Sequence, residues 1–257
     1  MQQFPHGVRA RLAMAMAAGV LLGCSDSTPP DRSGIFYGPV TAMAGGTGRA
    51  YVSLDGSGAP TDIGLALTET TLTGLTTDKA EFVFALPSQA SATAYRHAAI
   101  NWEPIGHGAP GTAYTVPHFD VHFYTITEAQ RAAIVLGDST LAARMVRPPA
   151  AEFIPAGYVV GGASVQMGLH WRDPTAPEFN GQPFGKTFIY GSYDGAMIFG
   201  EPMIAKTYLE TKPPAVVTPV KLPAQYSARG YQATSYTVGY DATAKEFRVS
   251  LSGLVSR

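Results

Sequence analysis

Polar and apolar side chains alternate in the stretch "VPHFDVHFY", residues 116–124. Successive side chains of a β-strand point to opposite faces of its sheet. The apolar positions 119, 121 and 123 are therefore predicted to face a core. The other face carries a polar row, which consists of His118, Asp120, His122 and Tyr124. This polar row is either a functional site or the side of the sheet that faces water.

Short segments rich in β-forming residues follow one another along most of the chain. Between them, 28 glycines and 20 prolines are spread as turn and loop positions. The segment 80–87 is mostly apolar and is predicted to be buried on both faces, and Asp194-Gly195 is predicted as the turn of a hairpin. The predicted strands and hairpins are residues 49–55, 61–69, 80–87, 97–104, 118–124, 162–171 and 186–204, followed by a terminal pair around the turn "ATAK".

Two short helices interrupt this pattern. Thr127 followed by Gln130 forms a capping-box pattern, which predicts a helix from Glu128 to Gly137. The sequence "STLAARMV" adds a second short helix before a pair of prolines. We therefore expect a mainly β protein, with a single antiparallel β-sandwich or barrel-like domain over residues 34–257 and one or two short helices.

The N-terminus has the pattern of an export signal. Arg9 and Arg11 precede the apolar run "LAMAMAAGVLLG", which is too short for a stable membrane span and typical of a signal-peptide core. The run ends in "LLGC", which resembles the lipobox of bacterial lipoproteins. The sequence thus predicts a signal peptide over residues 1–23, lipidation of Cys24 and a tether over residues 24–33. An ordinary secretory signal with an incidental cysteine is the alternative.

The predicted location follows from this signal. Acyl chains on Cys24 would hold the protein to the cell envelope without a spanning helix. In Gram-negative lipoproteins a serine after the cysteine, here Ser25, implies sorting to the outer membrane, although Asp26 departs from that pattern. We expect the protein at the periplasmic face of that membrane.

Charge limits the possible partners. Without Arg9 and Arg11 the mature chain has 16 basic and 19 acidic residues, a net charge of −3. This balance gives no electrostatic basis for binding nucleic acid. Charged residues make up only 14% of the chain, well below the usual quarter. A surface that is short of charge favours a homo-oligomer.

The polar row contains residue types that bind metal ions. His118 and His122 lie about 13 Å apart along a straight strand, too far to share one zinc ion, whose nitrogen ligands lie about 2.0–2.1 Å from it. Other ligands must come from elsewhere, and His170 and Glu201 are the best placed; His107 is on a nearby loop, and His97 is the weakest choice. The predicted metal ligands are His118, Asp120, His122, His170 and Glu201, and the expected cofactor is a divalent transition metal ion, zinc first.

Other chemistry finds little support. The chain has no G-x-S-x-G elbow, phosphate loop or dinucleotide-binding glycine pattern, and its single cysteine is Cys24. Two hypotheses remain. The protein is a metal-binding envelope protein, with hydration or hydrolysis as possible reactions, or it is a non-catalytic envelope-stress or assembly protein whose histidines are structural. Whether it is an enzyme stays open.

Three blocks carry a resemblance to a known family. They are "WEPIGHGAPGTAYTVPHFDVHFY", "MGLHWRDPTAPEFNGQPF" and "TFIYGSYDGAMIFGEPMI". Together they resemble an uncharacterised domain family of exported bacterial proteins, typified by a Thermus protein under extracytoplasmic sigma-factor control. The resemblance extends over roughly residues 34–212. It implies export and a closed homo-oligomer, and it implies no catalytic residues.

Overall fold

The structure, a computed structural model, describes residues 1–2, 31–108 and 113–257. The predicted signal peptide beyond Gln2, the lipidation site Cys24 and most of the predicted tether lie outside the described residues. The compact unit discussed below is Asp31–Arg257. Among its described residues, no helix has the length and apolar character needed to cross a membrane.

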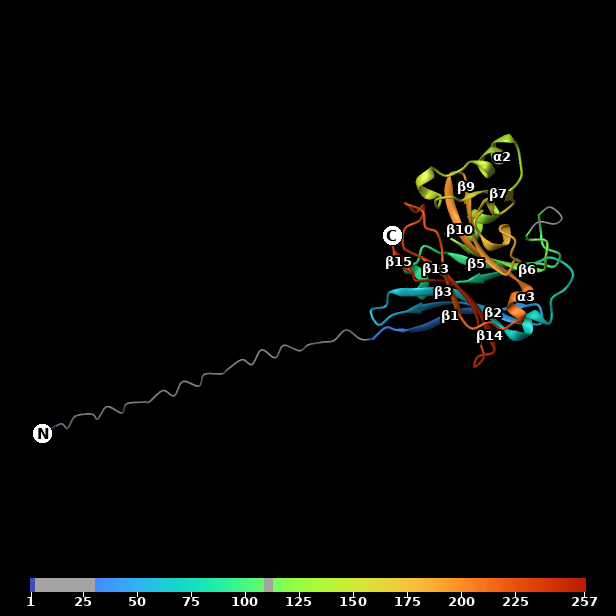
Figure 1. The fold of residues 1–257 in the computed structure, drawn as a ribbon. Coiled ribbons are helices and arrows are strands. Elements are labelled where there is room, and N and C mark those ends of the chain that lie inside the picture. Colours follow the sequence, from blue (N-terminus) through green and yellow to red (C-terminus); the bar gives the residue numbers. More distant parts are fainter. Residues whose placement is uncertain (3–30, 109–112) are drawn as a thin grey trace. The chain divides into compact units, whose positions relative to one another are not determined.

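One layer of this unit is an antiparallel sheet of six strands, which joins segments from both ends of the chain. Figure 1 shows the early strands, in blue and cyan, beside the red C-terminal ones. Their spatial order is β1 (Gly34–Met43), β2 (Gly46–Leu54), β3 (Pro60–Thr68), β14 (Glu246–Ser252), β13 (Ser235–Asp241) and β11 (Val216–Pro219).

The second layer is an antiparallel sheet of seven strands. A small third sheet pairs β12 (Tyr231–Gln232) with β15 (Val255–Ser256). In the second layer the spatial order is β4 (Ala80–Ala85), β5 (His97–Glu103), β6 (His118–Tyr124), β10 (Ala196–Ala205), β9 (Lys186–Tyr193), β8 (Gly168–Arg172) and β7 (Val159–Ser164).

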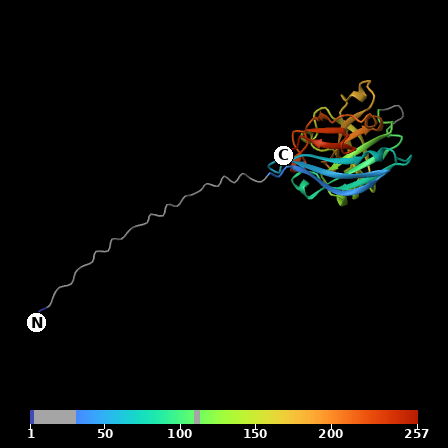
Figure 2. The same ribbon diagram turned by 90° about the horizontal axis from the view of Figure 1, so that it is seen from below.

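The two large sheets pack face to face around one main core. Val52 and Leu65 from the six-stranded sheet belong to the same buried cluster as Ile100, Val121 and Phe123 from the seven-stranded sheet. Each such side chain stabilises the fold by roughly 1.5–3 kcal/mol through burial. Figures 1 and 2 show the two layers from two directions. The expected mainly β, sandwich-like fold is confirmed.

The helices are short and lie between strands. They are α1 (Glu128–Ala132), α2 (Ser139–Val146) and α3 (Lys206–Glu210), together with the 3-10 turns η1 (Glu69–Leu72), η2 (Ser88–Ala92), η3 (Ala151–Phe153) and η4 (Pro177–Phe179). The predicted capping box of Thr127 and Gln130 is present. The helix ends earlier than the predicted Gly137: its last turn tightens, with the Ile134 N–H donating to the Arg131 carbonyl three residues back, at 3.0 Å.

Two strand predictions are wrong. Residues 162–171 form parts of two strands, β7 and β8, which turn at Gln166 (φ 64°) and Gly168 (φ 74°). The side chains around this turn are apolar enough to be read as one strand. The segment 80–87 is not buried on both faces, because β4 lies at the edge of its sheet and is largely half-buried or exposed.

Candidate metal centre

The polar row of β6 is buried, so the interpretation that it faces water is wrong. His118, His122 and Tyr124 are 0% exposed and Asp120 is 5% exposed. On the opposite face, Phe119, Val121 and Phe123 pack into the main core as predicted. The row lies on the outer face of the seven-stranded sheet, with apolar clusters around it. Ile134 and Met145 cover one end, and Phe184 covers the other.

Three of the predicted ligands converge on this outer face. His122, His170 and Glu201 each offer one ligand atom, and these three atoms all lie within 4.8 Å of one another. Strand pairing explains how they meet. β10 runs antiparallel to β6 with Gly200 opposite Phe123, which places Glu201 beside His122. His170 comes from β8, on the far side of β9.

A glycine and a phenylalanine hold the two histidine rings. Gly191 of β9 pairs with both His170 and Phe199. A Cβ at Gly191 would lie 1.9 Å from the Phe199 ring, so the absence of a side chain is what lets that ring lie there. The Phe199 ring contacts His122 and His170 edge-on, with centroids 4.9 and 5.5 Å away. Phe199 therefore fixes both rings from one side.

The surroundings of His170 favour the neutral ring, which is the form of histidine that binds a metal ion. Burial lowers its pKa, although Glu201 acts in the opposite direction. One ring nitrogen of His170 is hydrogen-bonded to the backbone of Gly162 in β7. A hydrogen bond of this kind from a ligating histidine to a backbone carbonyl fixes the tautomer and the ring orientation. The neutral ring then has its other nitrogen free.

His122 and Glu201 have buried polar atoms without hydrogen bonds. The His122 Nε2 and Glu201 Oε2 atoms lie 3.3 Å apart, yet neither has a hydrogen-bond partner among the described residues. Both residues are 2% exposed or less. Two ligands on a tetrahedral zinc ion, at about 2.0–2.1 Å from it, are separated by roughly 3.4 Å. The observed spacing fits two atoms that share a metal ion. Without the ion, two buried polar atoms would be left unpaired, which is costly.

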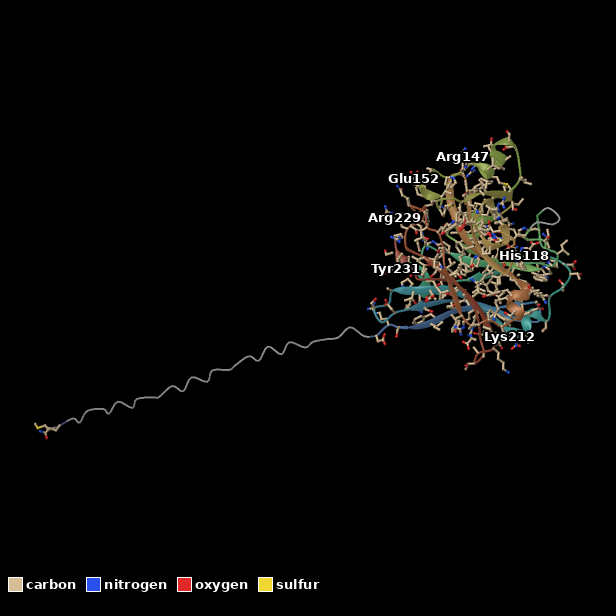
Figure 3. All side chains as sticks on the ribbon, viewed as in Figure 1. His118, Arg147, Glu152, Lys212, Arg229 and Tyr231 are labelled. Carbon is tan, nitrogen blue, oxygen red and sulfur yellow. The ribbon has the colours of Figure 1, made fainter. Side chains whose placement is uncertain are left out.

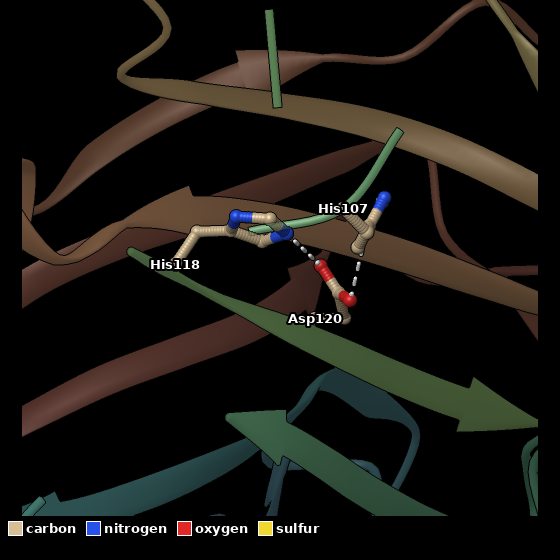
Figure 4. Close-up of side chains that lie close together, drawn as sticks. All are labelled: His107, His118 and Asp120. Atoms are coloured by element: carbon tan, nitrogen blue, oxygen red, sulfur yellow. Dashed lines mark hydrogen bonds and ion pairs between the residues drawn. The ribbon is translucent and has the colours of Figure 1, made fainter. Parts of the chain in front are cut away.

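A second group lies on the same face, and Figure 4 shows it. His107, His118 and Asp120 also bring one ligand atom each within 4.8 Å of one another. The His107 Nε2 is 3.2 Å from the Asp120 Oδ2, and the His118 Nε2 is 3.1 Å from the Asp120 Oδ1. The His118 Nδ1 lies 2.7 Å from the Val116 carbonyl and donates to it, which fixes that ring. The carboxylate thus lies between two imidazoles.

The electrostatics of this second group differ from those of the first. Burial alone would raise the pKa of Asp120, but its interactions with His107 and His118 outweigh burial and hold that pKa well below its usual range. Asp120 in turn raises the pKa of His107 through their hydrogen bond. The two imidazoles therefore already compensate the Asp120 charge, although the His118 Nε2 and Asp120 Oδ1 atoms are also buried without a hydrogen bond among the described residues. We take His122, His170 and Glu201 as the candidate metal centre and call the second group the His–Asp–His cluster.

Both groups open onto one pocket of about 510 Å³. Its size is within the range of small-molecule sites. His170 and Glu201 from the candidate metal centre line it, as do His107 and Asp120 from the His–Asp–His cluster. Figure 3 labels His118 of the His–Asp–His cluster among the side chains of the unit. A metal ion on the first group would be accessible to a small molecule.

The five predicted ligands are thus divided between two groups. Sequence reasoning separated His118 from His122 by distance along the strand, and they do lie in different groups. His97 belongs to neither; its ring stacks on Tyr124 at 4.7 Å and its Nδ1 lies 3.1 Å from the Ile126 carbonyl. Sequence reasoning missed Phe199. Phe199 lies over Gly191 because β9 and β10 pair in this register. The spacing of the two residues along the sequence does not by itself indicate that contact.

The fold and the pocket define a mainly β protein with a His/carboxylate centre. Among protein families, residues 55–102 match the model described as TTHB210-like, hypothetical protein TTHB210. Over this segment the chain is similar to an uncharacterised family. The segment includes all of β3 and β4, and it ends within β5, before every residue of both groups. The resemblance expected over residues 34–212 is thus supported over this part. No curated protein and no solved structure matches the chain.

Proposed function

We propose that this protein binds one divalent transition metal ion, zinc first, through His122, His170 and Glu201. The observation that carries the proposal is the 3.3 Å approach of the His122 Nε2 and Glu201 Oε2 atoms, both buried and neither hydrogen-bonded within the described residues. Two histidines and one carboxylate form a common set of three protein ligands for catalytic zinc, which leaves one position open. Here the pocket adjoins that position.

The chemistry that zinc supplies at such a site is activation of a water molecule. Hydrolysis or hydration of a small molecule in the pocket is therefore the reaction class to screen. The proposal is that the protein binds the metal ion. It applies equally to an enzyme and to a protein that stores or senses the ion.

We further propose that the protein acts at the cell envelope, held at the outer membrane by acyl chains on Cys24. The N-terminal charge, apolar run and "LLGC" support this location. A homo-oligomer is part of the same proposal. β7 supports it, because this edge strand is exposed along its length, carries no charge and displays Val159 and Val160. Light scattering on the purified protein measures the subunit number.

The test of metal binding is elemental analysis of residues 25–257, purified without an affinity tag or chelator. We expect about one transition metal ion per chain, and we expect its loss in the variants His122→Ala and His170→Ala. The matched control is His97→Ala, which removes a buried histidine outside the candidate metal centre. It should keep the ion.

The competing function is a non-catalytic assembly or stress protein in which these histidines are structural. A metal-free protein whose melting temperature does not rise with zinc, manganese or iron would establish that function instead. Equal loss of the ion in all three variants would point to general unfolding, so circular dichroism of each variant accompanies the analysis.

A further inference from the structure

The pocket beside the candidate metal centre carries one charged side chain that has no charged partner. Three carboxylates line the pocket, and each already has a neighbour of opposite or complementary character. Glu103 pairs with Lys79 at 2.5 Å, Asp120 lies between two imidazoles, and Glu201 belongs to the candidate metal centre. Arg172 also lines the pocket, and among the described residues no carboxylate lies within ion-pair distance of it. Its positive charge is therefore available to a ligand.

The position of Arg172 is set by the strand that carries His170. The two residues are two apart on β8, so their side chains leave the same face of the sheet. The Arg172 guanidinium lies over the Phe179 ring, 4.7 Å from its centroid. On the other side, the aliphatic part of the Arg172 side chain passes Gly161, where a Cβ would lie 3.5 Å from the Arg172 Cδ. Phe179 covers the face of the guanidinium group, so the N–H groups at its edge can still bind a ligand.

Strand register gives the separation between this charge and the metal centre. Glu201 pairs with Ile189, and the β8–β9 pairing of Trp171 with Tyr190 places Arg172 on the other side of Ile189. Glu201 and Arg172 are thus two strand spacings apart, about 10 Å between backbones. The residue between them is apolar, because Ile189 pairs with Glu201, lies next to Arg172 and lines the pocket. A small molecule with an apolar body would span that distance.

We propose that this pocket binds a small organic molecule with an apolar body and a terminal carboxylate, and that Arg172 holds the carboxylate. A planar guanidinium binds a carboxylate through two parallel hydrogen bonds, which fixes its orientation as well as its position. The opposite end of the molecule then lies at His122, His170 and Glu201. This inference rests on the proposed function only for the contact between the ligand and the candidate metal centre. Binding of the carboxylate by Arg172 needs no metal ion.

The test is isothermal titration calorimetry of residues 25–257 with hexanoate, in both EDTA-treated and zinc-loaded protein. We expect hexanoate to bind, and the neutral hexanamide to bind at least tenfold more weakly. Arg172→Gln should weaken hexanoate binding at least tenfold, because it removes the charge and the paired donors. Arg229→Gln is the matched control: Arg229 is exposed, does not line the pocket and lies away from His118 in Figure 3. It should bind hexanoate like the unaltered protein.

Several results would overturn the inference. One is no binding of hexanoate to either form of the protein, and another is equal binding by Arg172→Gln and the unaltered chain. Inorganic phosphate that binds as tightly as hexanoate would overturn the apolar body of the ligand. If hexanoate binds through Arg172 in a protein that takes up no metal ion, the inference stands and the proposed function fails. If the metal binds and hexanoate does not, the reverse holds.

Discussion

The His122 Nε2 and the Glu201 Oε2 lie 3.3 Å apart in a buried part of the sheet, and neither makes a hydrogen bond within the described residues. Two explanations are possible for such a pair. Either a cation shared by the two atoms compensates their burial, or a proton on His122 does so in a structural ion pair. The two explanations predict opposite effects of the same substitution.

The first prediction concerns Glu201→Gln. If a metal ion is the missing partner, the substitution should stabilise the metal-free protein, because it removes a buried charge that nothing compensates. The expected gain is about 1–3 kcal/mol, or several degrees in melting temperature. The same variant should lose the rise in melting temperature that zinc gives the unaltered chain. Thermal melts with EDTA and with zinc measure both effects. Destabilisation of the EDTA-treated variant would instead establish the structural ion pair.

The second prediction separates the two groups. Asp120→Asn removes the carboxylate that lies between His107 and His118. Because breaking a buried charged pair from one side is costly, we expect a loss of about 3 kcal/mol in the free energy of unfolding. The zinc content should remain near one ion per chain, since the candidate metal centre does not include Asp120. Urea unfolding and elemental analysis of the same sample provide the two values. Loss of zinc with the fold intact would assign the metal to the His–Asp–His cluster instead.

The third prediction concerns the ring that supports both histidines. Gly191→Ala would place a Cβ 1.9 Å from the Phe199 ring, which must then move away from His122 and His170. We expect a loss of roughly 1–3 kcal/mol in stability from overpacking and a fall in zinc affinity on the order of tenfold. Competition with a chromophoric chelator measures the affinity.

Gly185→Ala is the matched control for this variant. A Cβ at Gly185 would meet only the Tyr208 ring, at an ordinary contact distance of 3.5 Å. It should leave zinc affinity unchanged. Equal affinities for both variants would show that Phe199 has no part in holding the ligands.

The strand content of this protein could be predicted from local pattern because most of its strands are bounded by turns. β6 and the β9–β10 hairpin follow directly from alternation and from Asp194-Gly195. The β7–β8 hairpin could not be read in this way, since its turn at Gln166 uses no Asn-Gly or Asp-Gly signal. Local pattern also gives no indication of whether a strand is central or at an edge, which is why the burial of β4 was predicted wrongly.

The candidate site was predictable in its residue types and not in its grouping. An alternating row tells which side chains share a face, and it placed His118 and His122 on one face correctly. Which partners reach each histidine depends on the pairing of β6 with β10 and on the crossing of β9, and both are long-range. The burial of the row depends on segments such as α2 that pack over it, and no local feature of "HFDVHFY" encodes them.

The fourth prediction tests the anchor. Cys24→Ser removes the thiol to which an acyl chain would attach, so the signal should no longer be processed as a lipoprotein signal. We expect the protein to move from the membrane fraction to the soluble periplasmic fraction, with no label from radioactive palmitate. Ser25→Ala is the control and should keep both label and membrane association. An unaltered chain that carries no label would contradict lipidation.

The last prediction concerns pH and His97, which lies outside both groups. His97 is 2% exposed, and burial, with a further contribution from Arg131, lowers its pKa to about 4. In the unfolded chain the pKa is about 6.5. The unfolded state therefore binds a proton first as the pH falls, so stability decreases from pH 6.5 to pH 4, by up to about 3 kcal/mol from this residue. His97→Asn offers a donor where the His97 Nδ1 donates to the Ile126 carbonyl, and it does not titrate. Urea unfolding of EDTA-treated protein should show a shallower decrease for this variant, and parallel curves for the two proteins would contradict the assignment.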